Sequence, residues 1–401
     1  MLILVLNCGS SSIKFRLYDM KDETQLASGL VERIGSDDAI FSYKTYKFEG
    51  SKDTLSIKNH SIGLSVILNK LTSEDVGVIK DVSEIDSVGH RVVHGGEKFS
   101  TSILINQEVI DEIEKSIPLA PLHNPPNLSG ILACKEVMPN TPQVAVFDTA
   151  FHHTLPDYAF IYPLPYELYE SDKIRKYGFH GISHRYVSLE AAKMMGKKLD
   201  ELKIITCHLG NGASMAAIKN GKSIDTSMGF TPLEGLMMGT RCGSVDPAIV
   251  FYLMRTKNLT VDQVDNLFNK KSGLLGISGI SNDARDVVAA AKSGDYRAKL
   301  ALQIFAYRVK HYIGAYAAAM GGLDTIVMTA GIGENTEQIR ELALSDLEFL
   351  GVKLDKNRNN TDLKKSREIS ADESKVKVFV IFTNEEIMIA RDTKEILDRI
   401  N

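Results

Sequence analysis

The feature that most constrains the fold is a strand–turn–strand pattern that occurs twice, about two hundred residues apart. The first copy is "ILVLNCGSSSIKFRLY" (3–18) and the second is "IITCHLGNGASMAAIK" (204–219). A further pair, "VGHRVVHGGEK" (88–98) and "IVMTAGIGENTEQ" (326–338), matches as a strand followed by a Gly-containing turn. The repeat predicts two similar α/β domains that face each other, and a chance match between Gly-rich turns is the alternative.

Length and composition fit this organisation. A chain of 401 residues is too long for one ordinary core and suits two or three domains. The composition is that of a soluble globular protein, and a net charge of -4 gives no basic surface for nucleic acid. No apolar stretch is long enough to span a membrane, and residues 2–6 are too short for a secretory signal. We expect a cytoplasmic protein whose cysteines are reduced, because no CxxC spacing joins Cys8, Cys134, Cys207 and Cys242.

Residue periodicity predicts alternating strands and helices, and therefore an α/β protein with mixed sheets. Strands are expected at 3–6, 13–19, 26–33, 39–48 and 376–383, and helices near 61–70, 108–117, 127–138 and 295–320. An apolar stripe along the last of these helices predicts a buried face, which ends at Gly321-Gly322. The Lys-, Asp- and Asn-rich segment 353–378 is expected to be solvated loop.

Three glycine-rich turns follow predicted strands, at 7–12, 208–212 and 331–335. Small residues let backbone N–H groups approach a phosphate, and the third turn also opens a helix at Thr336. None of the three is a Walker A loop, and Gly331-x-Gly333 lacks the third small residue of a dinucleotide fingerprint. Each turn alone is more often just a tight turn. Together they predict a phosphate-binding cleft between two domains.

Four charged residues interrupt apolar or glycine-rich segments. Arg91 shares a strand face with Val93, which suits a small carboxylic acid, but an Arg paired with a buried acid fits equally well. Asp148 ends a strand, where α/β proteins place their chemistry, or it caps the next helix. His180 and Arg241 lie between glycines, where such residues are more often structural.

Two glutamates open the final helix. Thr383-x-x-Glu386 fits a capping box, which gives Glu386 a structural role. Glu385 is left over, and a carboxylate after a strand suits magnesium.

Motifs along the whole chain, taken in order, resemble the acetate kinase family. They are "LVLNCGSSSIKF", "GHRVVHGG", "FDTAFH", "YGFHGISH", "HLGNGAS", "GTRCGSVDP", "AGIGEN" and "FTNEEIMIARDT". The resemblance implies the duplicated actin, sugar kinase and Hsp70 fold with a nucleotide cleft between its domains. It implies an N-terminal domain of residues 1–150, completed by the helix 385–401, and a nucleotide-binding domain of residues 151–384. It also implies the reaction, in which ATP and acetate give ADP and acetyl phosphate reversibly, in a cytoplasmic homodimer with no nucleic-acid or membrane partner.

The resemblance also implies roles for individual residues. Asn7 and Glu385 would hold Mg²⁺, with Mn²⁺ as an alternative metal, and Asp148 would be the catalytic acid/base. His180 and Arg241 would stabilise the transferring phosphoryl group. Arg91 would bind the substrate carboxylate beside an acyl pocket of Val93, Leu122, Phe179 and Pro232. The nucleotide site would comprise Lys14, His208, Leu209, Gly210, Asn211, Gly212, Asp283, Ala284, Arg285, Gly331, Ile332, Gly333, Glu334 and Asn335.

Two other functions are compatible with such a chain. A propionate or other short-chain acid kinase differs from an acetate kinase by only about 1–3 kcal/mol per methylene in an apolar pocket. A non-catalytic nucleotide switch would share the fold, but it has no use for Arg91 and Arg241 beyond the γ-phosphate. A dinucleotide oxidoreductase is disfavoured because Gly331-x-Gly333 comes late in the chain and lacks its third glycine.

Overall fold

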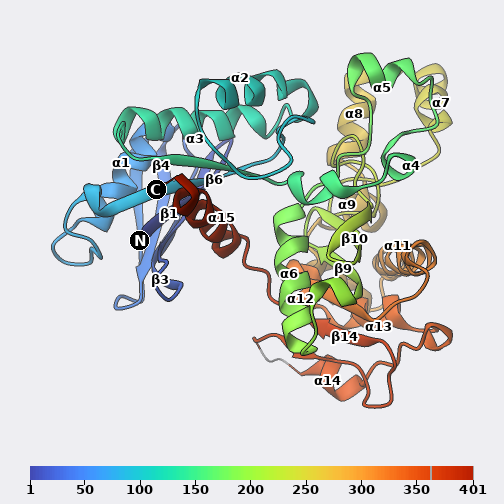
Figure 1. Ribbon diagram of the computed structural model, residues 1–401. Helices are drawn as coiled ribbons and strands as arrows, with labels where there is room; N and C mark the ends of the chain where they lie inside the picture. The colour runs from blue at the N-terminus through green and yellow to red at the C-terminus, as the bar shows by residue number, and fades with distance from the viewer. Residues whose placement is uncertain (362–363, 401) are drawn as a thin grey trace. The chain divides into compact units, whose positions relative to one another are not determined.

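The computed structural model describes residues 1–361 and 364–400, and the chain divides into two compact units. Unit 1 comprises Met1–Ala150 together with the C-terminal segment from Asn384, and unit 2 comprises Phe151–Thr383. Figure 1 shows the elements of both units, coloured along the chain. Within the described residues, no helix is both long enough and apolar enough to cross a membrane.

Unit 1 is built on one mixed sheet whose strand order is β5-β4-β3-β2-β1-β6-β8-β7. Strands β1 to β5 form an antiparallel meander, whereas β6 runs parallel to β1, and β8 runs parallel to β6. The strands are β1 (Leu2–Gly9), β2 (Ser12–Asp19), β3 (Thr24–Glu32), β4 (Ser36–Thr45), β5 (Ser51–Ile57), β6 (Ile85–Val92), β7 (Ile103–Leu104) and β8 (Gln143–Phe147). The helices are α1 (His60–Leu71), α2 (Gln107–Lys115), α3 (Asn124–Val137) and α15 (Glu385–Ile400), with 3-10 turns η1 (Val82–Glu84), η2 (Ile117–Leu119) and η3 (Ala150–Thr154), the last continuing into unit 2.

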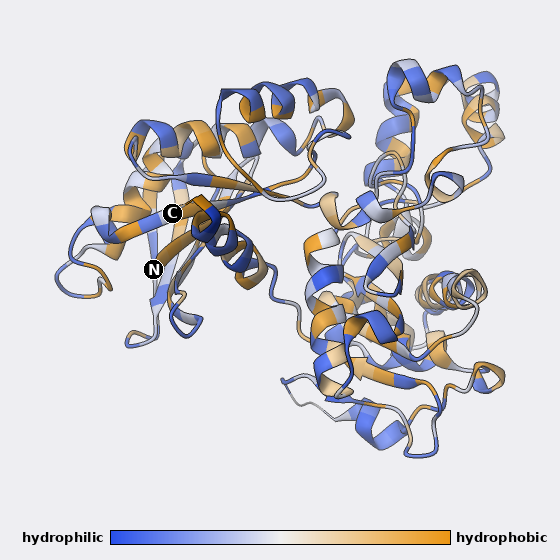
Figure 2. Ribbon diagram, in the orientation of Figure 1, coloured by the Kyte–Doolittle hydropathy of each residue, from blue (hydrophilic) through white to orange (hydrophobic). Residues whose placement is uncertain are grey.

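Helices cover both faces of this sheet, and glycines allow the close approach. A Cβ atom at Gly130 of α3 would lie 2.4 Å from the Cys8 sulfur of β1. On the other face, a Cβ atom at Gly89 of β6 would lie 2.4 Å from the Thr393 hydroxyl of α15. Figure 2 shows both hydrophobic and hydrophilic residues on α2, whose Val109, Ile110 and Ile113 are buried, as expected of a helix with one covered face.

Unit 2 repeats the central topology of unit 1, with the order β11-β10-β9-β12-β14-β13. Strands β9, β10 and β11 are antiparallel, β12 runs parallel to β9, and β14 runs parallel to β12. The strands are β9 (Lys203–Leu209), β10 (Ala213–Lys219), β11 (Lys222–Thr226), β12 (Thr325–Thr329), β13 (Arg367–Glu368) and β14 (Lys377–Val380). The two sequence pairs that suggested a repeat therefore occupy equivalent strands, β1–β2 with β9–β10 and β6 with β12.

The helices of unit 2 lie before β9, between β11 and β12, and after β12 along the chain. They are α4 (Asp157–Phe160), α5 (Glu167–Asp172), α6 (Gly181–Met194), α7 (Ala248–Lys257), α8 (Val261–Lys270), α9 (Gly273–Ser278), α10 (Ala284–Lys292), α11 (Tyr296–Met320), α12 (Ala330–Asn335), α13 (Glu337–Leu344) and α14 (Lys356–Asn360), with 3-10 turns η4 (Leu199–Glu201) and η5 (Glu348–Leu350). The predicted apolar stripe of α11 is confirmed, because Phe305, Val309 and Ile313 are buried. Gly321 ends this helix in the left-handed conformation, also as predicted.

Three local predictions are wrong. Strand β1 continues to Gly9 and β2 starts at Ser12, so the first turn is shorter than the predicted 7–12, and β9 continues to Leu209, so the second is shorter than the predicted 208–212. The predicted turn 331–335 belongs to helix α12, whose first N–H group, on Ala330, is capped by the Glu334 carboxylate at 2.9 Å. The segment 353–378 is not all solvated, because Ile369 and Ser370 are fully buried where β13 pairs with β14. Residues 362–363 of that segment lie outside the described residues.

The contact at Gly130 predicts opposite effects of one substitution at two helical glycines. Gly130→Ala forces a methyl group against Cys8 and should destabilise unit 1 by about 1–3 kcal/mol. The added methyl group of Gly314→Ala in α11 meets no atom of the described residues within 4 Å, and alanine's higher helix propensity should stabilise unit 2 by up to about 1 kcal/mol. Urea unfolding followed by circular dichroism measures both changes. Equal effects of the two substitutions would contradict the close α3–β1 packing.

Candidate functional site

Unit 1 brings Arg91, Asp148 and Glu385 together at the carboxyl ends of its parallel strands. Arg91 lies at the end of β6, Asp148 directly follows β8, and Glu385 opens α15. Arg91 Nη2 donates a hydrogen bond to Asp148 Oδ2 at 2.8 Å, and its Nε lies 3.6 Å from Glu385 Oε2. The alternative that Arg91 pairs with a buried acid is therefore realised, because the Asp148 side chain is 1% exposed.

The charges of this cluster depend on one another. Burial raises the pKa of Glu385, Arg91 opposes that shift, and Asp148 adds to it. Burial alone would lower the pKa of Arg91, but Asp148 and Glu385 outweigh it and raise the pKa above its ordinary value. The guanidinium is therefore firmly charged, and it holds two carboxylates that would otherwise repel each other.

Glu386 has a different role from the capping box that the sequence predicted. Its carboxylate forms ion pairs with Lys14 and, at 3.4 Å, with Arg16 Nη2. Burial acts against ionisation, but Lys14 and Arg16 hold the pKa of Glu386 below its ordinary value. Asn384 Oδ1 accepts hydrogen bonds from Arg16 Nη1 at 3.0 Å and from the Ile387 N–H at 3.3 Å. The start of α15 is thus fixed to β2, which positions Glu385.

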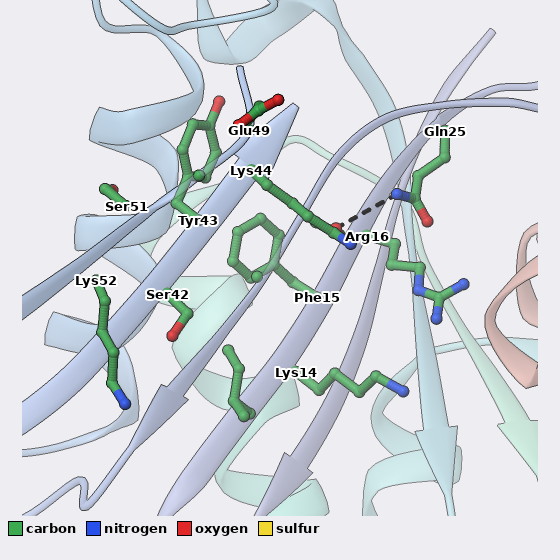
Figure 3. Close-up of a pocket in the computed structure, with 14 residues that line it drawn as sticks. Lys14, Phe15, Arg16, Gln25, Ser42, Tyr43, Lys44, Glu49, Ser51 and Lys52 are labelled. Atoms are coloured by element: carbon green, nitrogen blue, oxygen red, sulfur yellow. Dashed lines mark hydrogen bonds between the residues drawn. The ribbon is translucent and has the colours of Figure 1, made fainter. Parts of the chain in front are cut away.

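Lys14 also borders a groove on the face of β2 to β5. The groove has a volume of about 590 Å³ and is lined by Arg16, Ser42, Lys44 and Lys52 among others. Figure 3 shows the Lys14 and Arg16 side chains, which extend from alternate positions of β2. The Lys14 side chain is 47% exposed, so its ammonium can contact a ligand while it pairs with Glu386.

Two buried asparagines of α3, absent from the sequence prediction, hold the strand ends of unit 1. Asn127 donates to the Cys8 carbonyl at 2.8 Å and accepts from the Val93 N–H at 3.0 Å, so it joins the ends of β1 and β6. Asn124 bonds both the N–H and the carbonyl of His94. The sequence signal was weak, because two Asn residues near prolines read as an ordinary helix start.

Unit 2 brings His180, His208, Gly212 and Arg241 together. The rings of His180 and His208 stack with their centroids 4.1 Å apart. A Cβ atom at Gly212 would lie 3.4 Å from Arg241 Nη1 and 3.7 Å from His180 Nε2. His180 has a φ of 56°, a left-handed conformation that is costly for a non-glycine residue and is concentrated at functional sites.

A buried chain of hydroxyl groups and imidazoles supports His180, and the sequence prediction missed it. Ser214 Oγ lies 2.8 Å from His180 Nδ1 and 2.8 Å from His184 Nε2. His184 Nδ1 lies 2.7 Å from Thr206 Oγ1. Burial lowers the pKa of His184 well below its ordinary value, so that ring is neutral. The only available signal was the second histidine of "YGFHGISH", and its partners lie on strands distant in sequence.

Arg241 is a largely buried cation with neutral neighbours. Its Nη1 donates to the Pro232 carbonyl at 3.2 Å and lies 3.6 Å from the Met238 sulfur. No carboxylate pairs with Arg241 among residues 1–361 and 364–400, and burial lowers the pKa of this guanidinium. A buried cation of this kind gains from an anionic ligand.

The three segments predicted to bind nucleotide meet in unit 2. Asn211 accepts a hydrogen bond from the Asn282 side chain at 3.1 Å, next to Asp283, and its carbonyl accepts one from the Gly239 N–H. A Cβ atom at Gly333 would lie 3.6 Å from the Leu209 Cβ atom. The segments 208–212, 283–285 and 331–335 therefore surround one region of the unit.

The predicted nucleotide residues differ in what their side chains do. Asp283 caps α10 and pairs with Arg285, with 2.5 Å between the carboxylate and guanidinium. Glu334 accepts hydrogen bonds from the N–H groups of Ala330 and Thr383. Asn335 donates to the Gly331 carbonyl at 2.8 Å. These side chains fix the shape of the segments, which leaves backbone groups as the main candidates for ligand contacts.

The residues predicted for the acyl pocket differ in exposure. Val93 and Phe179 are buried, whereas Leu122 is 67% exposed. Nothing in the burial of Leu122 distinguishes it from a surface residue.

Comparisons with known proteins agree with these sites. A model described as the acetokinase family matches residues 2–391. An acetate kinase of Clostridium novyi is 58% identical, with 100% of each chain covered. The solved acetate kinase of Porphyromonas gingivalis has a TM-score of 0.94 at 49% identity, with 99% of each chain covered. A propionate kinase of Francisella tularensis has a TM-score of 0.91 at 43% identity, with 98% of each chain covered.

The fold is thus that of the small-acid kinases, with two related α/β units. At these identities and this coverage, the chain belongs to the acetokinase family.

The position of Gly212 beside Arg241 and His180 predicts that an added methyl group lowers kcat there but not at a glycine outside the site. Gly212→Ala would place that group beside Arg241 and His180 and should lower kcat at least about tenfold, because the methyl group would occupy the space that a phosphoryl group needs to reach both side chains. Gly314→Ala in α11, where no described atom lies within 4 Å of the added Cβ atom, is the matched control and should change kcat by less than about threefold. Steady-state kinetics on both folded variants tests the prediction, and equal losses would contradict it.

Proposed function

We propose that the protein is an acetate kinase, which transfers the γ-phosphoryl group of ATP to acetate. In the reverse direction, it transfers the phosphoryl group of acetyl phosphate to ADP. The observation that carries the proposal is Arg241, a largely buried guanidinium without a carboxylate partner among the described residues, beside Gly212 and His180. A transferring phosphoryl group is the anion that such a cation stabilises.

The acceptor chemistry makes modest demands on the protein. The acetate carboxylate is ionised at pH 7, so it attacks the γ-phosphorus without a strong general base. One P–O bond forms to the acetate oxygen while the bond to the β-phosphate oxygen breaks, and ADP leaves. We assign acetate binding to Arg91, beside Val93, with Leu122, Phe179 and Pro232 as the further acyl contacts.

The hydrogen-bond chain supports a specific tautomer of His180. A hydroxyl has one proton, so Thr206, His184, Ser214 and His180 must all donate in the same direction. If the chain runs from Thr206 towards His180, then His180 Nδ1 accepts and its Nε2 carries the proton. That N–H faces the side of Gly212 and would donate to a phosphoryl oxygen. We assign this direction to the active enzyme.

The nucleotide would be bound in unit 2. We assign ADP and ATP contacts to the backbone of residues 208–212, 283–285 and 331–335, and a phosphate contact to Lys14. The close approach of these segments around Asn211 and Leu209 supports the assignment.

Magnesium suits the oxygen donors of unit 1. The Glu385 carboxylate is largely buried, its pKa is raised by that burial, and its ion pair with Arg91 is long at 3.6 Å. A divalent cation would compensate the buried charge, and Asn7 offers an amide oxygen of the kind that Mg²⁺ or Mn²⁺ accepts. When bound, the metal would neutralise charge on the β- and γ-phosphates. On the family resemblance alone, we also propose that the enzyme is a cytoplasmic homodimer.

The direct test is acyl phosphate formation from ATP with Mg²⁺, trapped with hydroxylamine, for acetate, propionate and butyrate. We expect the highest kcat/KM with acetate and a loss of about 10–200-fold per added methylene. A higher kcat/KM with propionate would support the same mechanism with propionate as the preferred acceptor. No product with any acid, from folded protein that binds ATP, would overturn the proposal and favour a nucleotide switch.

Substitution of Asp148 tests its role in the transition state. Asp148→Asn keeps the shape but removes the charge that holds Arg91, so kcat should fall about 10²-fold or more while KM for ATP changes little. The matched control is Asp346→Asn, since Asp346 pairs with Lys310 at 3.2 Å on the surface of unit 2. An unchanged kcat for Asp148→Asn would exclude Asp148 from the catalytic step.

A further inference from the structure

We propose that Tyr162 and Glu234 form a clamp that positions Arg241 for phosphoryl transfer. The inference rests on the role proposed above for Arg241, and it makes Tyr162 and Glu234 positioning residues rather than catalytic ones. The contacts involved all lie within unit 2.

The clamp joins the two ends of the segment 230–234, which belongs to the long loop between β11 and α7. The Tyr162 hydroxyl donates a short hydrogen bond to Glu234 Oε2 and accepts one from the Phe230 N–H at 2.9 Å. Phe230 and Glu234 lie on either side of Pro232, so a single hydroxyl bridges the segment across this proline. Burial and the charge of Glu234 raise the pKa of Tyr162, which keeps the hydroxyl protonated as a donor.

Pro232 is the link to Arg241. Its carbonyl accepts the hydrogen bond from Arg241 Nη1 at 3.2 Å. Since no carboxylate pairs with Arg241 in the described part of the chain, this carbonyl is the main polar contact that orients the guanidinium. A shift of the segment 230–234 would therefore move the cation.

The neighbouring sequence accommodates the clamp. A Cβ atom at Gly229 would lie 1.7 Å from Glu234 Oε2 and 2.1 Å from the Tyr162 hydroxyl, so only glycine leaves room for both groups. The Gly229 carbonyl accepts the Tyr177 N–H at 3.0 Å, which fixes the start of the segment.

Other contacts hold the loop on either side of the segment around Pro232. The Gly235 N–H donates to the Ser244 hydroxyl at 3.0 Å, and the Ser244 N–H donates to the Gly235 carbonyl at 2.9 Å. The Gly239 N–H donates to the Asn211 carbonyl at 2.9 Å. These contacts fix the arms of the loop and its link to residues 208–212. Loss of the clamp should therefore displace Pro232 and Arg241 without unfolding the loop.

The test is a double-mutant cycle between Tyr162→Phe and Arg241→Ala. Tyr162→Phe should lower kcat about tenfold and leave KM for ATP within about twofold, because it misplaces a group that acts in the transition state. Arg241→Ala should lower kcat about 10²-fold or more. If Tyr162 acts through Arg241, the double variant should be no slower than Arg241→Ala alone.

Two further variants separate positioning from folding. Glu234→Gln retains an oxygen that accepts from Tyr162 and should keep kcat within about threefold of the original, whereas Glu234→Ala should resemble Tyr162→Phe. Tyr158→Phe removes a hydroxyl on an 86% exposed side chain nearby and serves as the matched control. Circular dichroism and urea unfolding establish that each variant is folded.

The outcomes distinguish the clamp from the proposed function. An unchanged kcat for Tyr162→Phe, beside a large loss for Arg241→Ala, would overturn the clamp and leave the proposed function standing. Multiplicative losses in the double variant would also overturn it, since Tyr162 would then act independently of Arg241. A small effect of Arg241→Ala would overturn the phosphoryl role of Arg241 and the inference with it.

Discussion

Parallel strand pairing is the constraint on which both candidate sites depend. In unit 1, β1, β6 and β8 run parallel, so the residues that follow them emerge at one edge of the sheet. Arg91 and Asp148 meet there although they are 57 residues apart in the chain. In unit 2, β9, β12 and β14 repeat the arrangement, and His208, Ala330 and Thr383 lie at or just after the ends of those strands. Each unit thus gathers functional groups by the same topological device.

The two sites differ in whether their buried charges have partners of opposite sign. In unit 1, Arg91, Lys14 and Arg16 face Asp148, Glu385 and Glu386, so each buried charge has an opposite partner. In unit 2, a carbonyl and a sulfur are the only polar contacts of the Arg241 guanidinium among the described residues. The balanced cluster suits a rigid frame for a carboxylate and a metal, whereas the uncompensated cation suits a phosphoryl group that arrives and leaves. The same burial that makes Arg241 costly when alone makes its interaction with an anion strong.

Local patterns predicted the strands, helix α11 and the family motifs, because hydrophobic periodicity and Gly-rich turns are properties of neighbouring residues. They failed where distant residues decide the outcome. Glu386 has the spacing of a capping box, yet two cations on β2 attract its carboxylate instead. The strand β5, with mostly exposed residues, has too little apolar alternation to be predicted. Tyr162 and Glu234 are 72 residues apart, and no local signal marks either one.

The use of a carbonyl to orient Arg241 has a consequence for the rest of unit 2. A carboxylate would hold the guanidinium more firmly, but it would also cancel the positive charge that a phosphoryl group requires. A carbonyl dipole leaves the charge available and binds more weakly, so the orientation of Arg241 depends on how rigidly Pro232 is held. The hydroxyl of Tyr162 supplies that rigidity with one donor and one acceptor contact. His180 is held by the same principle, because Ser214 and the neutral ring of His184 orient it without adding a charge. The direct hydrogen-bond partners of both Arg241 and His180 are therefore neutral, and the positive charge of Arg241 stays available for the ligand.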